Sequence, residues 1–244
     1  MEKIWKDQYQ VSWDDADMMG KAQLSAICNY LQLSAGNQAI DMGFGYDDVL
    51  AKNQVWVIVG LLLKMERYPG WRDMVFVETW PKGIDRLIAF RDFRIFDEQG
   101  RKIGAATSSW MILDIESRRP KPVDIVKDKM HLALPENALD KNPHMIRDTG
   151  PLNERYVHTA RYSEIDFNGH VNNTRYVDWA MDAFDIGRIH NEEVDTLLIN
   201  FLAEARAGQQ FGIAANNWNG KENLIQGTRL HDNKPAFRTS IRWK

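Results

Sequence analysis

The chain has 244 residues, 44% hydrophobic and 27% charged, and its 31 basic and 34 acidic side chains give a formal net charge of −3. This balance argues against a nucleic-acid-binding protein, which would carry a basic excess. The single cysteine, Cys28, excludes an internal disulfide framework and favours a reducing compartment. No apolar run approaches the roughly 18 residues of a membrane span, and residues 1–13 lack the apolar run of a signal peptide, so we expect a cytoplasmic protein.

The first half of the chain reads as a short strand, one helix and then several strands. Apolar residues from Leu24 to Ala35 recur at the spacing of one helical face. Strand-like runs follow at 55–66, 74–80, 87–96 and 105–115. Because short turns connect these runs, we expect an antiparallel sheet with the helix across its concave face.

A linker separates this half from a second one of the same kind. Residues 131–153 contain three prolines and many polar side chains, which predicts a linker between domains 1–130 and 154–244. In the second domain the apolar spacing from Tyr176 to Phe184 predicts a helix that Asn172 or Asn173 can cap. Strands are predicted at 196–204, 210–218, 223–230 and 236–243.

The two halves show signs of an internal duplication. Asp17-Met-Met-Gly20 precedes the first predicted helix, as Asp166-Phe-Asn-Gly169 precedes the second. Further matches in the same order are Glu66 with Glu204 and Trp80 with Trp218, each pair 138 residues apart, and Arg94-Ile-Phe-Asp97 with Arg229-Leu-His-Asp232. We therefore predict an α+β fold of two tandem units, each an antiparallel sheet wrapped around one long helix.

The densest polar cluster lies just before the second predicted helix. His170 is its only residue that can move protons near neutral pH, Asn168 can donate to a carbonyl, and Asp166 can orient an imidazole or the loop. Unpaired N–H groups at the helix start could stabilise an oxyanion. The first half keeps Asp17 and Gly20 but lacks the Asn and His. The alternative interpretation is structural, because Asp and Asn before a helix are usually caps or turn formers.

Glu204 is the second candidate. Alternation along the predicted strand 196–204 puts it on one face with Leu198, Asn200 and Leu202, where a carboxylate could border a dry cavity and act as a general base with a raised pKa. The structural alternative is equally supported, because Glu66 occupies the matching place in the half without His. In this structural interpretation the Glu204 carboxylate closes a sheet edge or pairs with an arginine.

Other catalytic motifs are missing. No G-x-S-x-G elbow, Walker loop or GxGxxG occurs, so a serine hydrolase or nucleotide enzyme has no support. The six histidines and one cysteine show no metal-ligand spacing, so we expect neither a metal nor a cofactor. Cys28 lies on the apolar helix face and is interpreted as a small buried hydrophobe.

Four motifs, in order along nearly the whole chain, carry a family resemblance: Arg67-Tyr-Pro-Gly-Trp-Arg-Asp73, Ala106-Thr-Ser-Ser-Trp-Met111, Arg118-Arg119 and Asn168-Gly-His-Val-Asn-Asn173. Together they resemble the acyl–acyl-carrier-protein thioesterases of plant plastids and bacteria. The resemblance implies a tandem double hotdog and hydrolysis of the thioester between a fatty acyl chain and the phosphopantetheine arm of the carrier protein. That reaction releases a free fatty acid and ends chain elongation.

The resemblance also implies site residues. The family's catalytic Asp, Asn, His and Glu correspond to Asp166, Asn168, His170 and Glu204. The next residue is often Cys in plant members and is Ala205 here, which favours direct attack by water. Either His170 or Glu204 could be the final base. The lack of a long N-terminal targeting segment suggests a bacterial, cytoplasmic form.

Several expectations are less specific. An apolar tunnel for the acyl tail is expected in the first half, lined by residues such as Ile27, Leu31, Trp56 and Ile58, and a basic patch for the acidic carrier protein at Arg118, Arg119 and Lys121. Three alternative functions stay open: an acyl-CoA thioesterase, a non-catalytic acyl-binding module, and a hotdog dehydratase or hydratase. A monomer and a homodimer are both compatible with a tandem repeat.

Overall fold

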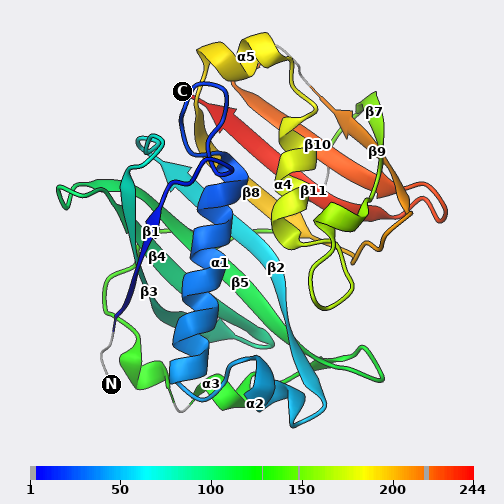
Figure 1. Cartoon of the computed structure of the whole chain (residues 1–244). Coiled ribbons are helices and arrows are strands. Elements are labelled where there is room, and N and C mark those ends of the chain that lie inside the picture. The colour runs from blue at the N-terminus through cyan, green and yellow to red at the C-terminus, as the bar shows by residue number, and fades with distance from the viewer. Residues whose placement is uncertain (1–3, 128, 148, 217–219) are drawn as a thin grey trace. The chain divides into compact units, whose positions relative to one another are not determined.

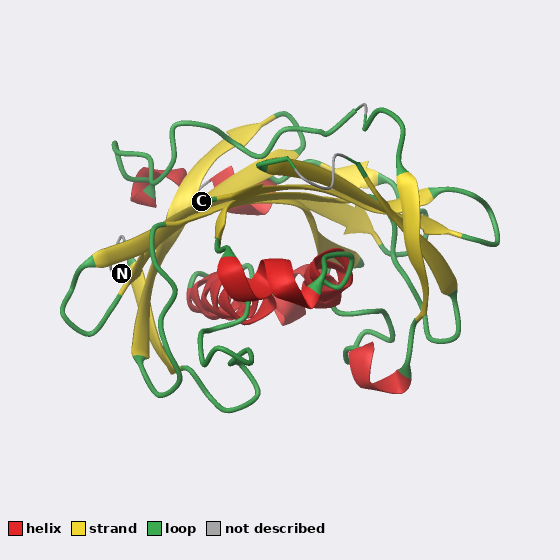
Figure 2. Cartoon of the chain, turned by 90° about the horizontal axis from the view of Figure 1, so that it is seen from above, coloured by secondary structure: helices red, strands yellow, loops and turns green. Residues whose placement is uncertain are grey.

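A computed structural model describes residues 4–127, 129–147, 149–216 and 220–244. The chain forms two compact units, Met1–Pro143 and His144–Lys244, which are described separately. Each unit combines one antiparallel sheet with helices, as the sequence predicts (Figure 1). In each unit the longest helix lies on the concave side of that unit's own sheet (Figure 2).

In the first unit the strands follow the order β1-β3-β4-β5-β2, and β6 pairs with β5. Their bounds are Trp5–Gln10 (β1), Gln54–Met65 (β2), Met74–Asp85 (β3), Ile88–Phe96 (β4), Lys102–Asp114 (β5) and Pro120–Lys121 (β6). The helices are Leu24–Asp41 (α1), Tyr46–Leu50 (α2) and Asp124–Lys127 (α3), with a 3-10 turn at Met130–Leu132. The four predicted strands correspond to β2 to β5, and the short β6 is an addition.

Helix α1 packs its predicted apolar face on the sheet. Leu24, Ile27, Cys28, Leu31 and Ala35 are all buried. Cys28 is 1% exposed, which confirms its interpretation as a small buried hydrophobe. The helix ends just before a glycine at position 43, whose φ of +76° only glycine adopts readily.

In the second unit the strand order is β8-β11-β10-β9-β7. The strands are Asn153–Thr159 (β7), Val194–Phe201 (β8), Gln210–Ala215 (β9), Glu222–Arg229 (β10) and Pro235–Trp243 (β11). The helices are Asn173–Met181 (α4) and Ile186–Asn191 (α5), with a 3-10 turn at Tyr162–Glu164. All four predicted strands form, but β8 stops three residues before Glu204. Trp218 lies outside the described residues.

Helix α4 begins at the predicted cap. The Asn172 side-chain oxygen accepts hydrogen bonds from the backbone N–H and the hydroxyl of Thr174, both at 3.0 Å. The helix has nine residues, half the length of α1, and ends before Phe184. Phe184 is nevertheless buried and packs edge-on against Trp243, because the turn after α4 keeps facing the sheet.

The predicted linker 131–153 is bound to both units in turn. In the first unit the Ala138 N–H donates to the buried Asp92 carboxylate at 2.7 Å. In the second unit the Ile146 N–H donates to the Asn200 side chain, also at 2.7 Å. The division between the units therefore falls inside the segment that the sequence marks as a linker.

The duplication extends to individual hydrogen bonds before each main helix. The Asp17 carboxylate accepts the N–H groups of the residues two and four positions later, and so does Asp166. Gly20 and Gly169 close the two turns with φ of +71° and +76°. The two loops are therefore the same hydrogen-bonded turn, repeated 149 residues apart.

The same comparison corrects one predicted pairing. The Glu66 N–H donates to a carbonyl of β5 at 2.8 Å, and the Leu202 N–H donates to the equivalent carbonyl of β11 at 2.8 Å. Leu202 is thus the counterpart of Glu66, and Glu204 corresponds to Tyr68. The predicted match of Glu66 with Glu204 is wrong. The connections between elements differ in length in the two units, so the residue offset between equivalent positions changes along the chain.

Among the helices in the described part of the chain, none is both long and apolar enough to cross a membrane.

Candidate active site

The loop before α4 has its shape set by Asp166. One oxygen of this carboxylate accepts the backbone N–H groups of Asn168 at 2.9 Å and His170 at 3.4 Å. The Asp166 N–H in turn donates to the His170 carbonyl at 2.8 Å. Since Gly169 supplies the left-handed residue of this turn, positions 168 and 170 are held in one orientation.

The structure brings His170 and Glu204 together. Their Nε2 and Oε2 atoms lie 3.2 Å apart. Two hydrogen bonds hold the segments that carry them: the Val171 N–H donates to the Ala205 carbonyl at 2.8 Å, and the Tyr176 hydroxyl donates to the Ala203 carbonyl at 3.1 Å. An imidazole and a carboxylate are thereby fixed side by side.

The contact between these two groups is close but poorly aligned for a hydrogen bond. His170 Nε2 is buried and makes no directed hydrogen bond to any described residue. The Glu204 side chain is 36% exposed, so the carboxylate stays open to solvent. Glu204 is therefore the more accessible member of the pair, and His170 Nε2 is enclosed beside it.

Tyr176 of α4 packs beneath the pair. Burial raises the pKa of its hydroxyl above the ordinary value, and the nearby Glu204 carboxylate adds to that shift. The phenol therefore stays protonated and remains a donor to the Ala203 carbonyl.

The predicted position of Glu204 needs a correction. It lies in the segment after β8, which ends at Phe201, and not on the strand. The N–H groups of Leu202 and Ala203 both donate to the Ala236 carbonyl, at 2.8 and 3.1 Å, so the regular alternation stops there. With a third of its side chain exposed, Glu204 does not border a dry cavity.

Asn168 and the start of α4 provide the remaining polar groups. The Asn168 side chain is exposed and makes no hydrogen bond to a described residue. At the helix start the Thr174 N–H is used by the cap, whereas the Asn173 N–H has no partner among the described residues. Both are donors available to a ligand.

Sequence reasoning missed a cluster that supports the loop. The Glu164 carboxylate accepts the Arg161 N–H at 2.6 Å, the Trp179 indole N–H at 2.7 Å and a contact from His158 at 3.0 Å. Burial alone would raise the pKa of Glu164, but these hydrogen bonds outweigh it and hold the pKa below its usual range. Only the Glu164 half of a capping box forms, because the Arg161 guanidinium cannot accept a hydrogen bond, and no residue pattern in the sequence marks the cluster.

Glu164→Gln is expected to lower Tm by about 2–8 °C at pH 7, because it removes charge-assisted hydrogen bonds worth about 1–2 kcal/mol. A carboxyl group whose pKa is depressed on folding stabilises the fold above its unfolded pKa of about 4.3 and loses that effect as pH falls through the folded pKa. The deficit should therefore be smaller when thermal denaturation is measured at about pH 3 than at pH 7. Glu136→Gln, on a side chain 79% exposed, is the control. An equal deficit at both pH values would contradict the account.

The first unit has the same loop without the chemistry. Lys21 stands at the counterpart of His170, Met19 at that of Asn168 and Tyr68 at that of Glu204. The two loops share the Asp carboxylate and the glycine of the turn but none of the other three site residues. The candidate general bases therefore occur in the second unit alone.

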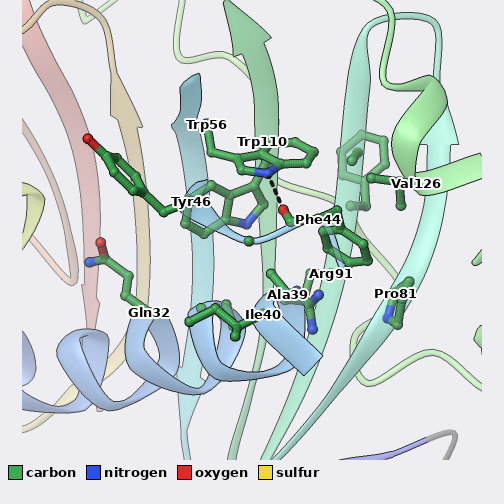
Figure 3. Close-up of a pocket in the computed structure, with 15 residues that line it drawn as sticks. Gln32, Ala39, Ile40, Phe44, Tyr46, Trp56, Pro81, Arg91, Trp110 and Val126 are labelled. Atoms are coloured by element: carbon green, nitrogen blue, oxygen red, sulfur yellow. Dashed lines mark hydrogen bonds between the residues drawn. The ribbon is translucent and has the colours of Figure 1, made fainter. Parts of the chain in front are cut away.

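The first unit instead contains an apolar pocket of about 200 Å³ between the C-terminal half of α1 and the sheet (Figure 3). Of the four predicted tunnel residues, Trp56 lines it. Ile27 and Leu31 do not, because they lie nearer the start of α1, and Ile58 is also packed elsewhere in the core. The lining residues are Gln32, Ala35, Gly36, Ala39, Ile40, Phe44, Gly45, Tyr46, Trp56, Pro81, Ala89, Phe90, Arg91, Trp110 and Val126.

Two further expectations concern ligands and partners. Within the described residues, no three His, Cys, Asp or Glu side chains gather as a metal-ligand set. In the predicted basic patch Arg118 and Arg119 are exposed, whereas Lys121 lies 3.4 Å from the Asp114 carboxylate, which offsets its charge.

Comparison with known families and proteins agrees along the chain. The acyl-ACP thioesterase N-terminal domain matches residues 2–129, and the acyl-ACP thioesterase C-terminal domain matches residues 152–243. A chloroplastic oleoyl-acyl carrier protein thioesterase of Coriandrum sativum is 26% identical over 219 residues, which cover 83% of this chain. The aligned region spans 59% of that protein's length.

Solved structures show the same architecture. An acyl-ACP thioesterase from Bacteroides thetaiotaomicron superposes with a TM-score of 0.90 at 26% identity, covering 99% of this chain and 98% of that one. A 12:0-ACP thioesterase from Umbellularia californica shares the fold, with a TM-score of 0.84 at 19% identity over 100% of this chain and 98% of that one. The predicted double hotdog is confirmed, and the chain belongs to the acyl-ACP thioesterase family.

Proposed function

We propose that the protein hydrolyses the thioester of a fatty acyl–acyl carrier protein, releasing a free fatty acid and ending chain elongation. The single observation that carries this proposal is the 3.2 Å contact between His170, on the loop before α4, and Glu204, in the segment after β8. Membership of the thioesterase family supports the same chemistry. The buried Cys28 is compatible with work in a reducing cytoplasm, which we propose as the location.

In the proposed mechanism a water molecule attacks the thioester carbonyl carbon. His170 or Glu204 accepts the proton of that water, and the negative charge moves to the carbonyl oxygen. The Asn168 side chain holds the carbonyl or the water, and the N–H groups near the start of α4, such as that of Asn173, receive the oxyanion. The carbon–sulfur bond then breaks, and the thiol of the carrier leaves with the proton returned to it. Asp166 acts as a positioning residue for the loop.

Direct attack by water is supported by the absence of a cysteine from the unit that contains the pair. The residue after Glu204 is Ala205, which has no reactive atom. Cys28 belongs to the other unit, where it is 1% exposed within the core. Buried thiols in apolar surroundings are poor nucleophiles, because burial disfavours the thiolate.

The two units have different roles in this proposal. Residues 154–244 form the catalytic domain and residues 1–130 form the chamber for the acyl tail, with 131–153 between them. The apolar pocket against α1 supports the chamber role, since its walls include Phe44, Trp56 and Trp110. Apolar walls favour an alkyl chain over water by about 25 cal/mol for each Å² that is buried.

The experiment compares one saturated acyl group on the carrier protein and on coenzyme A, over a series of chain lengths, by release of free thiol. We expect the higher kcat/KM with the carrier protein. A higher kcat/KM with coenzyme A would favour the acyl-CoA thioesterase. Tight acyl binding without thiol release would favour a non-catalytic module. In a separate incubation with hydroxyacyl and enoyl thioesters, their interconversion without thiol release would favour a hydratase or dehydratase.

A further inference from the structure

A buried arginine lines the apolar pocket of the first unit (Figure 3). Arg91 belongs to β4 and is 7% exposed. Its hydrogen bonds to described residues both start from Nη1, and they end on two neutral oxygens, Gln38 Oε1 and Thr79 Oγ1. Its Nε and Nη2 groups therefore have no partner among the described residues.

No carboxylate of the described residues offsets this charge. The neighbouring Asp92 is occupied by Lys82 at 3.3 Å, by the Thr107 hydroxyl and by the Ala138 N–H. Adjacent strand residues point to opposite faces of a sheet, so this carboxylate is turned away from Arg91. A buried cation without an anion is energetically unfavourable, which makes it unusual in an apolar wall.

Burial lowers the pKa of Arg91 to about 9. The guanidinium is therefore still predominantly charged at neutral pH, and this positive charge has no counter-ion among the described residues.

Gln38 supplies a second unfilled donor beside the arginine. It is 1% exposed, and its Oε1 accepts from Arg91. Its Nε2 is buried and has no hydrogen-bond partner among the described residues. Gln38 is not among the residues that line the pocket, so it holds one edge of the guanidinium, while Nε and Nη2 of Arg91 remain as donors for an anion.

The rest of the pocket defines the body of the ligand. Ile40, Phe44, Trp56 and Trp110 are all apolar or aromatic lining residues. A wholly apolar chain would leave the guanidinium unmatched. A multiply charged phosphate would lose its hydration against these walls and find a single cation. A monoanion attached to an alkyl chain satisfies both parts of the pocket.

We propose that this pocket binds the carboxylate of an unesterified fatty acid through the Nε and Nη2 groups of Arg91, with the alkyl chain against the aromatic wall. The inference extends the proposed function, because a fatty acid is the product of the proposed hydrolysis. Bound in this way, the product occupies space proposed for the acyl tail of the substrate and inhibits the enzyme competitively.

The test is a calorimetric titration of the whole protein with three ligands of equal chain length: dodecanoate, 1-dodecanol and dodecylammonium. Tryptophan fluorescence provides a second readout, since Trp56 and Trp110 line the pocket. We expect dodecanoate to bind about 10-fold or more tighter than the alcohol, because hydrogen bonds to a charged group are the stronger ones. The ammonium ligand should bind most weakly. Equal affinities for acid and alcohol would overturn the proposal.

Arg91→Met keeps an unbranched apolar stem and removes the guanidinium with its charge. We expect it to lose about 10-fold or more in dodecanoate affinity while its dodecanol affinity is unchanged or higher. Arg94→Met is the matched control on the same strand, where the arginine stacks over Trp80 and pairs with Glu136. Unchanged dodecanoate binding by folded Arg91→Met would contradict the assignment.

These titrations need neither a carrier protein nor turnover. Should Arg91→Met fail to fold, the order of the three ligands on the wild-type protein decides the matter alone. A protein that binds dodecanoate selectively but hydrolyses no thioester would support the anion site and refute the proposed function. A protein that hydrolyses the thioester but does not bind dodecanoate selectively would refute the anion site only.

Discussion

His170→Ala and Glu204→Gln are each expected to lower kcat for acyl–carrier-protein hydrolysis by about 10²–10⁴-fold, the usual effect of losing a general base. The two side chains meet at 3.2 Å, with the Glu204 carboxylate partly exposed and His170 Nε2 enclosed beside it. Neither belongs to the buried core, since their side chains are 22% and 36% exposed, so circular dichroism and Tm should stay near the wild-type values. Release of free thiol is the measurement.

The duplicated loop offers a matched control for this prediction. Lys21→Ala changes the counterpart of His170 in the first unit, on the same Asp–Gly turn. We expect its kcat to stay within about threefold of the wild type, because surface substitutions of this kind have small effects. Full activity in folded His170→Ala would show that the imidazole has no part in the reaction.

Asp92→Ala is expected to destabilise the first unit by about 3–5 kcal/mol, because removing one partner of a buried ion pair leaves an uncompensated charge. The Asp92 side chain is fully buried and that of Lys82 is 8% exposed. The carboxylate also accepts the Thr107 hydroxyl at 2.5 Å and the Ala138 N–H at 2.7 Å. The substitution therefore also releases the end of the first unit from β4.

Thermal denaturation followed by circular dichroism measures this effect, with an expected fall in Tm of about 6–20 °C. Glu136→Ala is the control, because it removes a carboxylate that is 79% exposed and paired with Arg94 at 3.2 Å. Exposed pairs contribute about 0–1 kcal/mol. A shift for Asp92→Ala no larger than that of the control would show that the buried pair contributes little.

The loop before α4 could be predicted from the sequence because its determinants are local. The turn needs an Asp whose side chain accepts backbone N–H groups and a Gly with positive φ, and both lie within four residues. The Asn172 cap is equally local. The repetition of the same turn at Asp17 added independent support for a duplicated fold.

Glu204 shows where an alternating pattern fails. The sequence continues Leu198, Asn200, Leu202 and Glu204 without a break, so the predicted strand runs through them. In the structure two successive N–H groups share one carbonyl of β11, and the ladder ends. Such a register change depends on the partner strand and leaves no trace in the hydrophobic pattern.

Arg91 shows a second limit. In the sequence it is a single charge within the predicted strand 87–96, a place usually occupied by a solvated side chain. Its burial depends on how α1 covers β4, and its partner Gln38 is 53 residues away. Long-range packing of this kind decides which charges are enclosed, and local propensity does not report it.

The most direct test of the account combines His170→Ala and Glu204→Gln in one protein. The measurement is kcat/KM for thiol release from a saturated acyl–carrier protein by the wild type, the two single variants and the double variant. If both groups act on the same water, the double variant should be little worse than the poorer single variant, as for residues that act as a unit. If the fold-decrease in kcat/KM of the double variant equals the product of the two single decreases, the two groups act independently, and the proposed pair is contradicted.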